Sequence, residues 1–204
     1  MKIRYLIPNF FTTISLLAGL LAMNFIINSR YPTAAWIIFL AIIIDGLDGK
    51  TARLLKASTD FGALYDTLSD FFVFGIMPAF LIYKASLEAT TPLGVIPAVI
   101  FTLFGAFRLI RYTIAKDKSI LTTAFHGLPI PAAAGVVASL ILIDKHLWDC
   151  LGYHQFISVM IILVSFLMIS RIRYAAVEKE NYSVPKRIIL LILITVFINF
   201  NQKI

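Results

Sequence analysis

The chain has 204 residues, of which 60% are hydrophobic and 14% are charged, with a net charge of +7 at neutral pH. Soluble domains carry about a quarter charged residues, so a chain this poor in charge cannot cover a water-soluble globule of its size. This excludes a cytosolic enzyme, a disordered chain and a soluble nucleic-acid binder, and it predicts a polytopic membrane protein. The excess of basic residues then indicates membrane-flanking loops and contact with anionic lipid, without a nucleic-acid partner.

Apolar runs of about 20 residues predict membrane-spanning helices, because the hydrocarbon core of a bilayer is about 30 Å thick. In chain order they cover residues 9–28, 33–55, 60–84, 93–115, 128–145, 155–173 and 187–200. The sequence therefore predicts an all-α polytopic transmembrane helix bundle, formed by one domain over residues 1–204. Residues 174–186 are predicted to be a polar cytoplasmic linker before a short seventh helix.

The basic residues predict how the chain crosses the membrane, because lysine and arginine concentrate in cytoplasmic loops. With the N-terminus in the cytoplasm, fourteen of the 18 basic residues fall on the cytoplasmic side and four on the other. We therefore expect a multi-pass protein of the cell membrane. Its N-terminus and the loops after the second, fourth and sixth helices face the cytoplasm.

Acidic residues are concentrated where the second predicted helix ends and the third begins. Asp45 and Asp48 are three residues apart on the second helix, whereas Gly62, Asp66 and Asp70 follow at intervals of four on the third. Each set shares one helix face, and the short link makes the two helices antiparallel neighbours, so the acidic faces are expected to meet. Carboxylates near a bilayer are costly and therefore indicate function.

Clustered carboxylates repel one another, and a divalent cation would neutralise them. Ligands that are all oxygen favour Mg²⁺, Mn²⁺ or Ca²⁺ over zinc. Arg53 and Lys56 add positive charge at the rim, which suits phosphate, so the segment predicts a phosphoryl-transfer site. Asp60 is expected to be the N-cap of the third helix and not a ligand. The small residues beside the aspartates are explained equally well by helix packing or by a flat ligand.

Eight residues of this segment form one pattern with fixed spacing. They are Asp45, Asp48, Gly49, Ala52, Arg53, Gly62, Asp66 and Asp70. At every position the pattern resembles the signature of the CDP-alcohol phosphatidyltransferase family. Members of that family transfer a phosphatidyl group from a CDP-linked lipid to an alcohol and release CMP. The resemblance implies a core of six transmembrane helices, a homodimer, and a site open to the cytoplasm.

Motifs outside the signature resemble the phosphatidylserine synthase branch of this family. They are Pro8, Asn9 and Thr12, the stretch 19–22, Phe74 and Gly75, Pro78 and Ala79, and the stretches 107–112 and 127–135. Ser15 and Val73 depart from the branch, which often carries asparagine and serine at these positions. The departures concern the shape of the alcohol pocket and not the reaction.

The resemblance also implies roles for individual residues. Two divalent cations, Mg²⁺ or Mn²⁺ with Ca²⁺ as the alternative, would be held by Asp45, Asp48, Asp66 and Asp70. Asp70 would also be the catalytic base that takes the proton of the alcohol. The CDP-lipid would be bordered by Asp48, Gly49, Ala52, Arg53 and Gly62.

Arg108 and Arg111 are three residues apart at the end of the fourth predicted helix. Both are candidates to bind the carboxylate of serine or a phosphate, because a guanidinium group is a forked donor. The alternative is anchoring at the membrane interface, where arginine extends its charge toward water. His126, next to a turn that contains glycine and proline, is expected to be a polar loop residue.

The leading functional prediction is an enzyme of phospholipid biosynthesis that transfers a phosphatidyl group from CDP-diacylglycerol, or a CDP-ether lipid, to L-serine. One alternative is the same chemistry with glycerol 3-phosphate or inositol phosphate as the acceptor. A different class is a cation transporter that uses the aspartates as its ion path. Transporters carry inverted repeats and broken helices, whereas the aspartates here gather at one helix pair.

Overall fold

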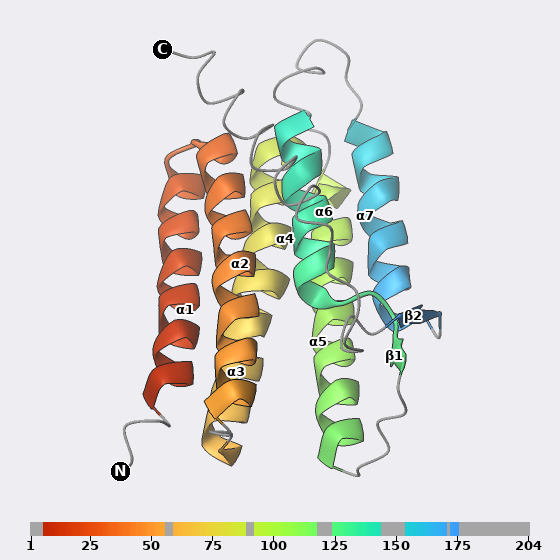
Figure 1. Cartoon of the computed structure of the whole chain (residues 1–204). Coiled ribbons are helices and arrows are strands. Elements are labelled where there is room, and N and C mark those ends of the chain that lie inside the picture. Colours follow the sequence, from red (N-terminus) through yellow and green to blue (C-terminus); the bar gives the residue numbers. More distant parts are fainter. Residues whose placement is uncertain are drawn as a thin grey trace.

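The computed structural model describes most of the chain between residues 6 and 175. The described parts are residues 6–55, 59–88, 92–117, 124–143, 154–170 and 172–175. They form a bundle of helical rods that run up and down next to one another (Figure 1). The rods are α1 (Leu6–Ile27), α2 (Tyr31–Leu55), α3 to η3 (Asp60–Leu87), α5 (Val95–Asp117), α6 (Ile130–Ile143) and α7 (His154–Ile169). The predicted all-α membrane bundle is therefore confirmed.

The third rod contains two π-helical stretches. It consists of α3 (Asp60–Asp70), η2 (Phe71–Ile76), α4 (Met77–Ile82) and η3 (Tyr83–Leu87), without an interruption. Pro78 lies at the start of α4 and cannot donate the usual helical hydrogen bond. The π-helical turn before it changes the local hydrogen-bond register, which lets the rod continue past the proline.

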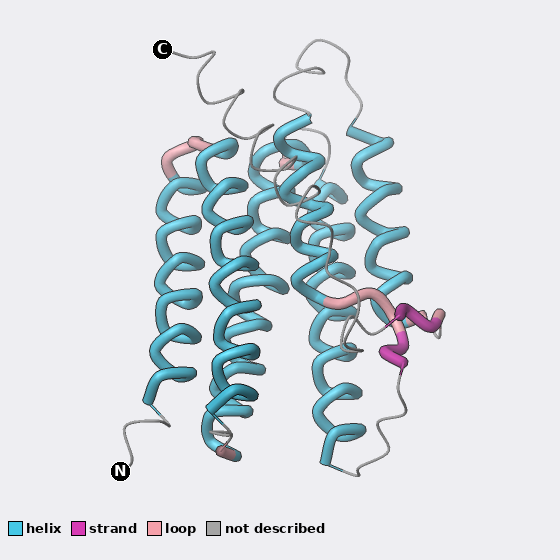
Figure 2. The backbone as a smooth tube through the Cα atoms, viewed as in Figure 1, coloured by secondary structure: helices cyan, strands magenta, loops and turns pink. Residues whose placement is uncertain are grey.

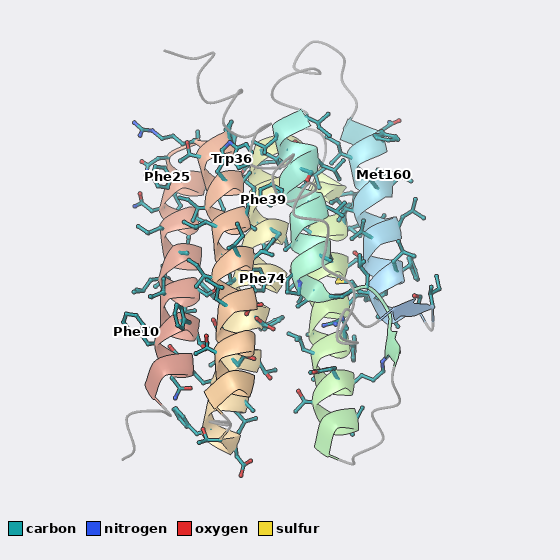
Figure 3. The ribbon with its side chains drawn as sticks, in the orientation of Figure 1. Phe10, Phe25, Trp36, Phe39, Phe74 and Met160 are labelled. Atoms are coloured by element: carbon teal, nitrogen blue, oxygen red, sulfur yellow. The ribbon has the colours of Figure 1, made fainter. Side chains whose placement is uncertain are left out.

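The rods pack through small and aliphatic side chains. Ala18 and Ala22 of α1 and Ala34 and Ala35 of α2 are buried, which lets these helices approach closely. Phe74 of η2 is fully buried near the middle of the bundle, as its label in Figure 3 indicates. The core thus lies between the rods along η2, α4 and η3 of the third rod, whereas Ser69 is the one buried residue of α3.

The outer surface of the bundle is strongly apolar. Leu17, Leu21, Leu40 and Phe107 are each more than half exposed, and Phe10 points away from the bundle in Figure 3. An apolar surface of this kind is a liability in water and is stable in lipid. Within the described part of the chain, three helical segments are long and apolar enough to cross a membrane, namely Asn9–Ile27, Asp60–Leu87 and Val95–Ala115. These features indicate a multi-pass membrane protein.

The last two described helices each differ from the predicted span at one end. α6 begins at Ile130 and α7 ends at Ile169, where the apolar runs predicted spans over residues 128–145 and 155–173. The residues that directly follow α6 lie outside the described part of the structure. α6 begins well above the lower ends of α3 and α5 in Figure 1.

A short β-ribbon lies beside the lower ends of α6 and α7. β1 (Ala124–His126) pairs antiparallel with β2 (Arg173–Ala175), and Figure 2 shows the two strands at the edge of the bundle. Two predictions were wrong here: the sixth span does not continue to residue 173, and His126 belongs to a strand and not to a loop. The two strands are far apart in sequence, so their pairing leaves no periodic signal. The remainder of the predicted linker, 176–186, and the predicted seventh helix, 187–200, lie outside the described residues.

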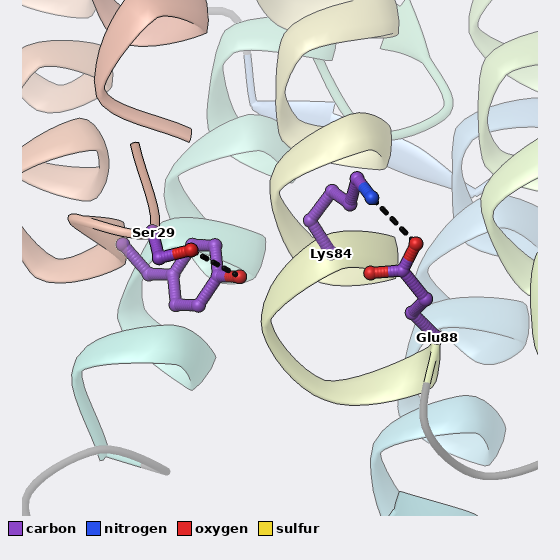
Figure 4. Close-up of polar contacts among 4 residues, drawn as sticks. Ser29, Lys84 and Glu88 are labelled. Atoms are coloured by element: carbon purple, nitrogen blue, oxygen red, sulfur yellow. Dashed lines mark hydrogen bonds and ion pairs between the residues drawn. The ribbon is translucent and has the colours of Figure 1, made fainter. Parts of the chain in front are cut away.

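The two ends of the bundle differ in their polar contacts. The end where α2 finishes and α3 begins, here called the aspartate end, carries Asp45, Asp66 and Asp70. At the opposite end Lys84 forms an ion pair with Glu88, one helical turn later, and the Tyr31 hydroxyl donates to Ser29 (Figure 4).

Candidate functional site

Three aspartates meet at the aspartate end. Asp45 comes from α2, whereas Asp66 and Asp70 come from consecutive turns of α3. One carboxylate oxygen of each lies within 4.8 Å of one from each of the others. All three side chains are half-buried. The prediction that the acidic faces of the two helices meet is confirmed for these three residues.

The donor set fits a hard divalent cation. It offers carboxylate oxygens, as Mg²⁺, Mn²⁺ and Ca²⁺ prefer, and no described nitrogen or sulfur ligand joins the group. The three oxygens lie close enough to one another that Asp45, Asp66 and Asp70 would be able to hold one cation together. Three like charges at this separation would otherwise repel one another.

The other predicted members of the signature are only partly described. Asp48 follows Asp45 by one turn of α2, and Ala52 and Arg53 follow on the same helix. Their side chains lie outside the described part of the structure, and Lys56 lies outside it altogether. The roles expected for these four residues remain predictions.

The N-cap of α3 is Thr59 and not Asp60. The Thr59 backbone is extended, and its hydroxyl accepts a hydrogen bond of 3.0 Å from the backbone N–H of Gly62. Asp60 is the first helical residue, where its negative charge favours the positive end of the helix dipole. The prediction for Asp60 as the cap was therefore wrong by one position, because either side chain satisfies the sequence rule for caps.

Gly62 is surrounded closely by polar atoms. A Cβ at this position would lie 2.9 Å from Oδ1 of Asn9 and 3.0 Å from Oγ1 of Thr59. Asn9 belongs to α1, whose Thr13 hydroxyl lies 3.1 Å from the hydroxyl of Tyr65 on α3. The start of α1 therefore joins the site beside Gly62. The Pro8–Asn9–Thr12 motif was the sequence signal for this contribution, but Asn9 was not among the predicted site residues.

Gly49 has a different environment. A Cβ placed on Gly49 meets no described atom within 4 Å. Among the described residues, helix packing therefore does not explain this glycine. The sequence allowed two explanations for the small residues, helix packing or a flat ligand. The missing packing contact at Gly49 favours the ligand there.

The two arginines of α5 lie in different environments. Arg108 is 9% exposed, lies within electrostatic range of Asp70, and its Nε has no hydrogen-bond partner among the described residues. Arg111 is exposed, and its Nη1 donates a hydrogen bond of 3.1 Å to the carbonyl oxygen of Ile169 at the end of α7. Burying an arginine is costly unless an anion compensates its charge, so Arg108 is suited to an anionic ligand.

Comparison with known proteins identifies the family of the chain. The family model described as CDP-alcohol phosphatidyltransferase matches residues 5–170. A protein of Helicobacter pylori named CDP-diacylglycerol–serine O-phosphatidyltransferase is 33% identical over 193 residues, which cover 94% of this chain and 81% of that protein. The protein of the same name from Methanocaldococcus jannaschii is 38% identical over 169 residues, with coverages of 82% and 73%. That from Bacillus subtilis is 28% identical over 174 residues, with coverages of 85% and 92%. The chain therefore belongs to the CDP-alcohol phosphatidyltransferase family.

Proposed function

We propose that the protein transfers the phosphatidyl group of CDP-diacylglycerol, or of a CDP-ether lipid, to the hydroxyl of L-serine and releases CMP. The observation that carries the proposal is the meeting of Asp45, Asp66 and Asp70 at one end of the bundle, with the buried Arg108 nearby. The serine-specific names of the relatives support serine as the acceptor.

The aspartates would hold one or two divalent cations, Mg²⁺ or Mn²⁺, with Ca²⁺ as the alternative. Asp45, Asp66 and Asp70 supply the described oxygens, and Asp48 would join them from the next turn of α2. A bound divalent cation neutralises the diphosphate and stabilises the negative charge on departing CMP.

In our proposal Asp70 is the general base. Its carboxylate takes the proton of the serine hydroxyl, and the serine oxygen forms a bond to the phosphorus that carries the lipid. The bond between that phosphorus and the bridging oxygen breaks, and the oxygen leaves with CMP. A positioned carboxylate is needed because a neutral hydroxyl is a poor nucleophile. The proximity of Asp70 to Arg108 supports an acceptor bound between them.

Arg108 would bind the carboxylate of serine. Its guanidinium is buried and its Nε has no described partner, so a bound anion would receive a charge-assisted hydrogen bond in a site of low polarity. The pairing would also offset the cost of burying the cation. An acceptor that carries a phosphate would use the same chemistry, which is why the acceptors have to be compared directly.

The CDP-lipid would lie along the ends of α2 and α3. A Cβ on Gly49 meets no described atom, and Asp48, Ala52, Arg53 and Gly62 would border the cytidine and the diphosphate. The acyl chains would remain in the bilayer, against the apolar outer surface of the bundle. We further propose one domain over residues 1–204 that acts as a homodimer in the cell membrane, with its N-terminus and its site facing the cytoplasm.

The test is CMP release by the full-length protein from CDP-diacylglycerol in detergent with Mg²⁺ or Mn²⁺. Serine, glycerol 3-phosphate, inositol and inositol phosphate are compared as acceptors in one preparation. We expect release that depends on serine and exceeds release with the other three. Faster release with glycerol 3-phosphate or inositol phosphate would overturn serine as the acceptor. Ion uptake by proteoliposomes without CDP-lipid, together with no CMP release, would overturn the enzyme.

A further inference from the structure

The end of α7 and the segment just beyond it receive hydrogen bonds from two other parts of the chain. Arg111 of α5 donates to the carbonyl of Ile169 at 3.1 Å, and the backbone N–H of Leu128 donates to the carbonyl of Leu167 at 3.0 Å. The backbone N–H of Gly127 donates at 3.0 Å to the carbonyl of Ile172, three residues after α7. The last carbonyls of a helix lack partners within the helix, and near a membrane they need such donors. We call these three hydrogen bonds the α7 junction.

Gly127 makes the α7 junction sensitive to a single methyl group. Its φ is +83°, which favours glycine, and a Cβ there would lie only 2.2 Å from the carbonyl oxygen of Met168. The segment continues directly from β1, which is paired with β2 beyond the end of α7 (Figure 2). A substitution at Gly127 therefore disturbs the junction without changing any charge.

The α7 junction lies one helical turn from Arg108. Phe104, Arg108 and Arg111 follow at i, i+4 and i+7 on α5, so they share one face. Phe104 packs edge-to-face on Phe166 of α7, with ring centroids 5.2 Å apart. α5 is thus attached to α7 on both sides of Arg108, by a ring contact on one side and by Arg111 on the other.

A second contact fixes the neighbouring face of α5. The Cδ1 methyl group of Ile130 packs against two glycines. It would lie 3.0 Å from a Cβ added to Gly105 and 3.6 Å from a Cβ added to Gly75 of η2. Gly105 precedes Arg108 by three residues, so this face is close-packed as well. A rotation of α5 that moves Arg108 must therefore break contacts to α7 or to Ile130.

We propose that Arg111 is a positioning residue: its hydrogen bond to the Ile169 carbonyl fixes α5 against α7 and thereby holds Arg108 in place to bind the acceptor. The inference rests on the proposed role of Arg108. It gives Arg111 a role different from that of a substrate ligand. A carbonyl oxygen requires one donor, and a cation at the C-terminal end of α7 also favours the helix dipole.

The experiment measures kcat and KM for serine and for CDP-diacylglycerol in full-length variants. Only variants whose size-exclusion profile in detergent matches that of the wild type are compared. Arg111→Met should raise the serine KM about tenfold, the effect of about 1.4 kcal/mol, and leave the KM for CDP-diacylglycerol within about twofold. Arg111→Lys should restore most of the loss, because one donor is enough for a carbonyl. Arg108→Lys should not be tolerated, because a carboxylate is bound by two donors of a guanidinium fork. Arg30→Met, which changes an exposed arginine at the opposite end, is the matched control.

Gly127→Ala provides a second arm that does not alter charge. If Arg111 acts through the α7 junction, Gly127→Ala should reproduce the rise in serine KM, and the double variant should be no worse than the worse single variant, since both break the same contact. Amide hydrogen exchange at Leu128 should also become faster in Arg111→Met and not in Arg111→Lys.

Three results would overturn the inference. The first is a rise in serine KM in the double variant that equals the product of the two single rises. The second is a serine KM in Arg111→Lys as high as in Arg111→Met. The third is unchanged amide hydrogen exchange at Leu128 in Arg111→Met. If Gly127→Ala does not fold, the lysine comparison and the exchange measurement decide. If the wild type uses another acceptor, the proposed function fails, whereas the inference is still decided by the KM of that acceptor and by the exchange at Leu128.

Discussion

The charged side chains are arranged in opposite ways at the two ends of the bundle. At the end away from the site, Lys84 and Glu88 neutralise each other within one turn of a helix. At the aspartate end, Asp45, Asp66 and Asp70 bring three like charges together from two helices. The first arrangement is complete without a ligand. The cluster of three aspartates is destabilised by repulsion between its carboxylates, and a bound cation removes this repulsion. Functional sites commonly carry such an energetic cost.

Removal of divalent cations is the most severe test of this comparison. We expect that chelation abolishes CMP release and that Mg²⁺ or Mn²⁺ restores it, because the aspartate end then lacks its compensating charge. The measurement is turnover of metal-stripped protein as each cation is added back. Full turnover in excess chelator would contradict the metal assignment.

Asp66→Asn should separate activity from stability. Turnover should be lost, because a ligand oxygen and its charge are removed from the cluster. The metal-free variant should melt at a higher temperature than the metal-free wild type, because repulsion among the aspartates is reduced. Thermal unfolding of both proteins in chelator, next to CMP release in Mg²⁺, tests both parts. Near-normal turnover would show that Asp66 does not hold the metal.

Asp70→Asn distinguishes a base from a ligand within the same cluster. Loss of a general base costs about 10²–10⁴-fold in rate. The variant should therefore lose turnover yet retain CDP-lipid affinity better than Asp45→Asn does. CDP-lipid binding and CMP release are measured for both variants in one detergent preparation. Equal loss of affinity in the two would make Asp70 mainly a ligand, and the base would have to be sought elsewhere, first at His126.

Gly49→Ala tests whether the open space beside Gly49 belongs to the CDP-lipid. The added methyl group meets no described atom, so thermal stability should be unchanged, whereas CDP-lipid affinity should fall about tenfold, as expected for a lost close contact of about 1.4 kcal/mol. Gly135→Ala is the matched control, because its Cβ would make ordinary contacts with Ile42 and Phe39 at 3.6 and 3.7 Å. Unchanged affinity in Gly49→Ala would show that the CDP-lipid does not approach this glycine.

The smallest effect is expected at the opposite end. Glu88→Gln removes one partner of an exposed ion pair, and such pairs contribute little because water and salt screen them. Turnover and melting temperature should both remain close to those of the wild type. A marked loss of turnover would mean that the ion pair at this end is coupled to the aspartates at the other end.

Local sequence patterns were sufficient to predict much of the fold and of the cluster. Apolar run length predicted the long helices, because the bilayer thickness sets their length and membrane helices form all backbone hydrogen bonds internally. The interval of four between Asp66 and Asp70 predicted one acidic face on the third helix, because helical periodicity places residues four apart on one face. The short link between the second and third helices predicted that Asp45 would meet this face.

Only the tertiary structure decided the features that depend on contacts between distant residues. The pairing of β1 with β2 joins segments about fifty residues apart, and β2 lies beyond the end of α7 at Ile169. Arg108 and Arg111 look alike in sequence, three residues apart on one helix. One is buried near Asp70, whereas the other donates to the end of α7. Helical periodicity determines the face on which a residue lies. Its burial and its partners depend on which helix packs against that face, and for these two arginines the packing of α5 on α7 decides the difference.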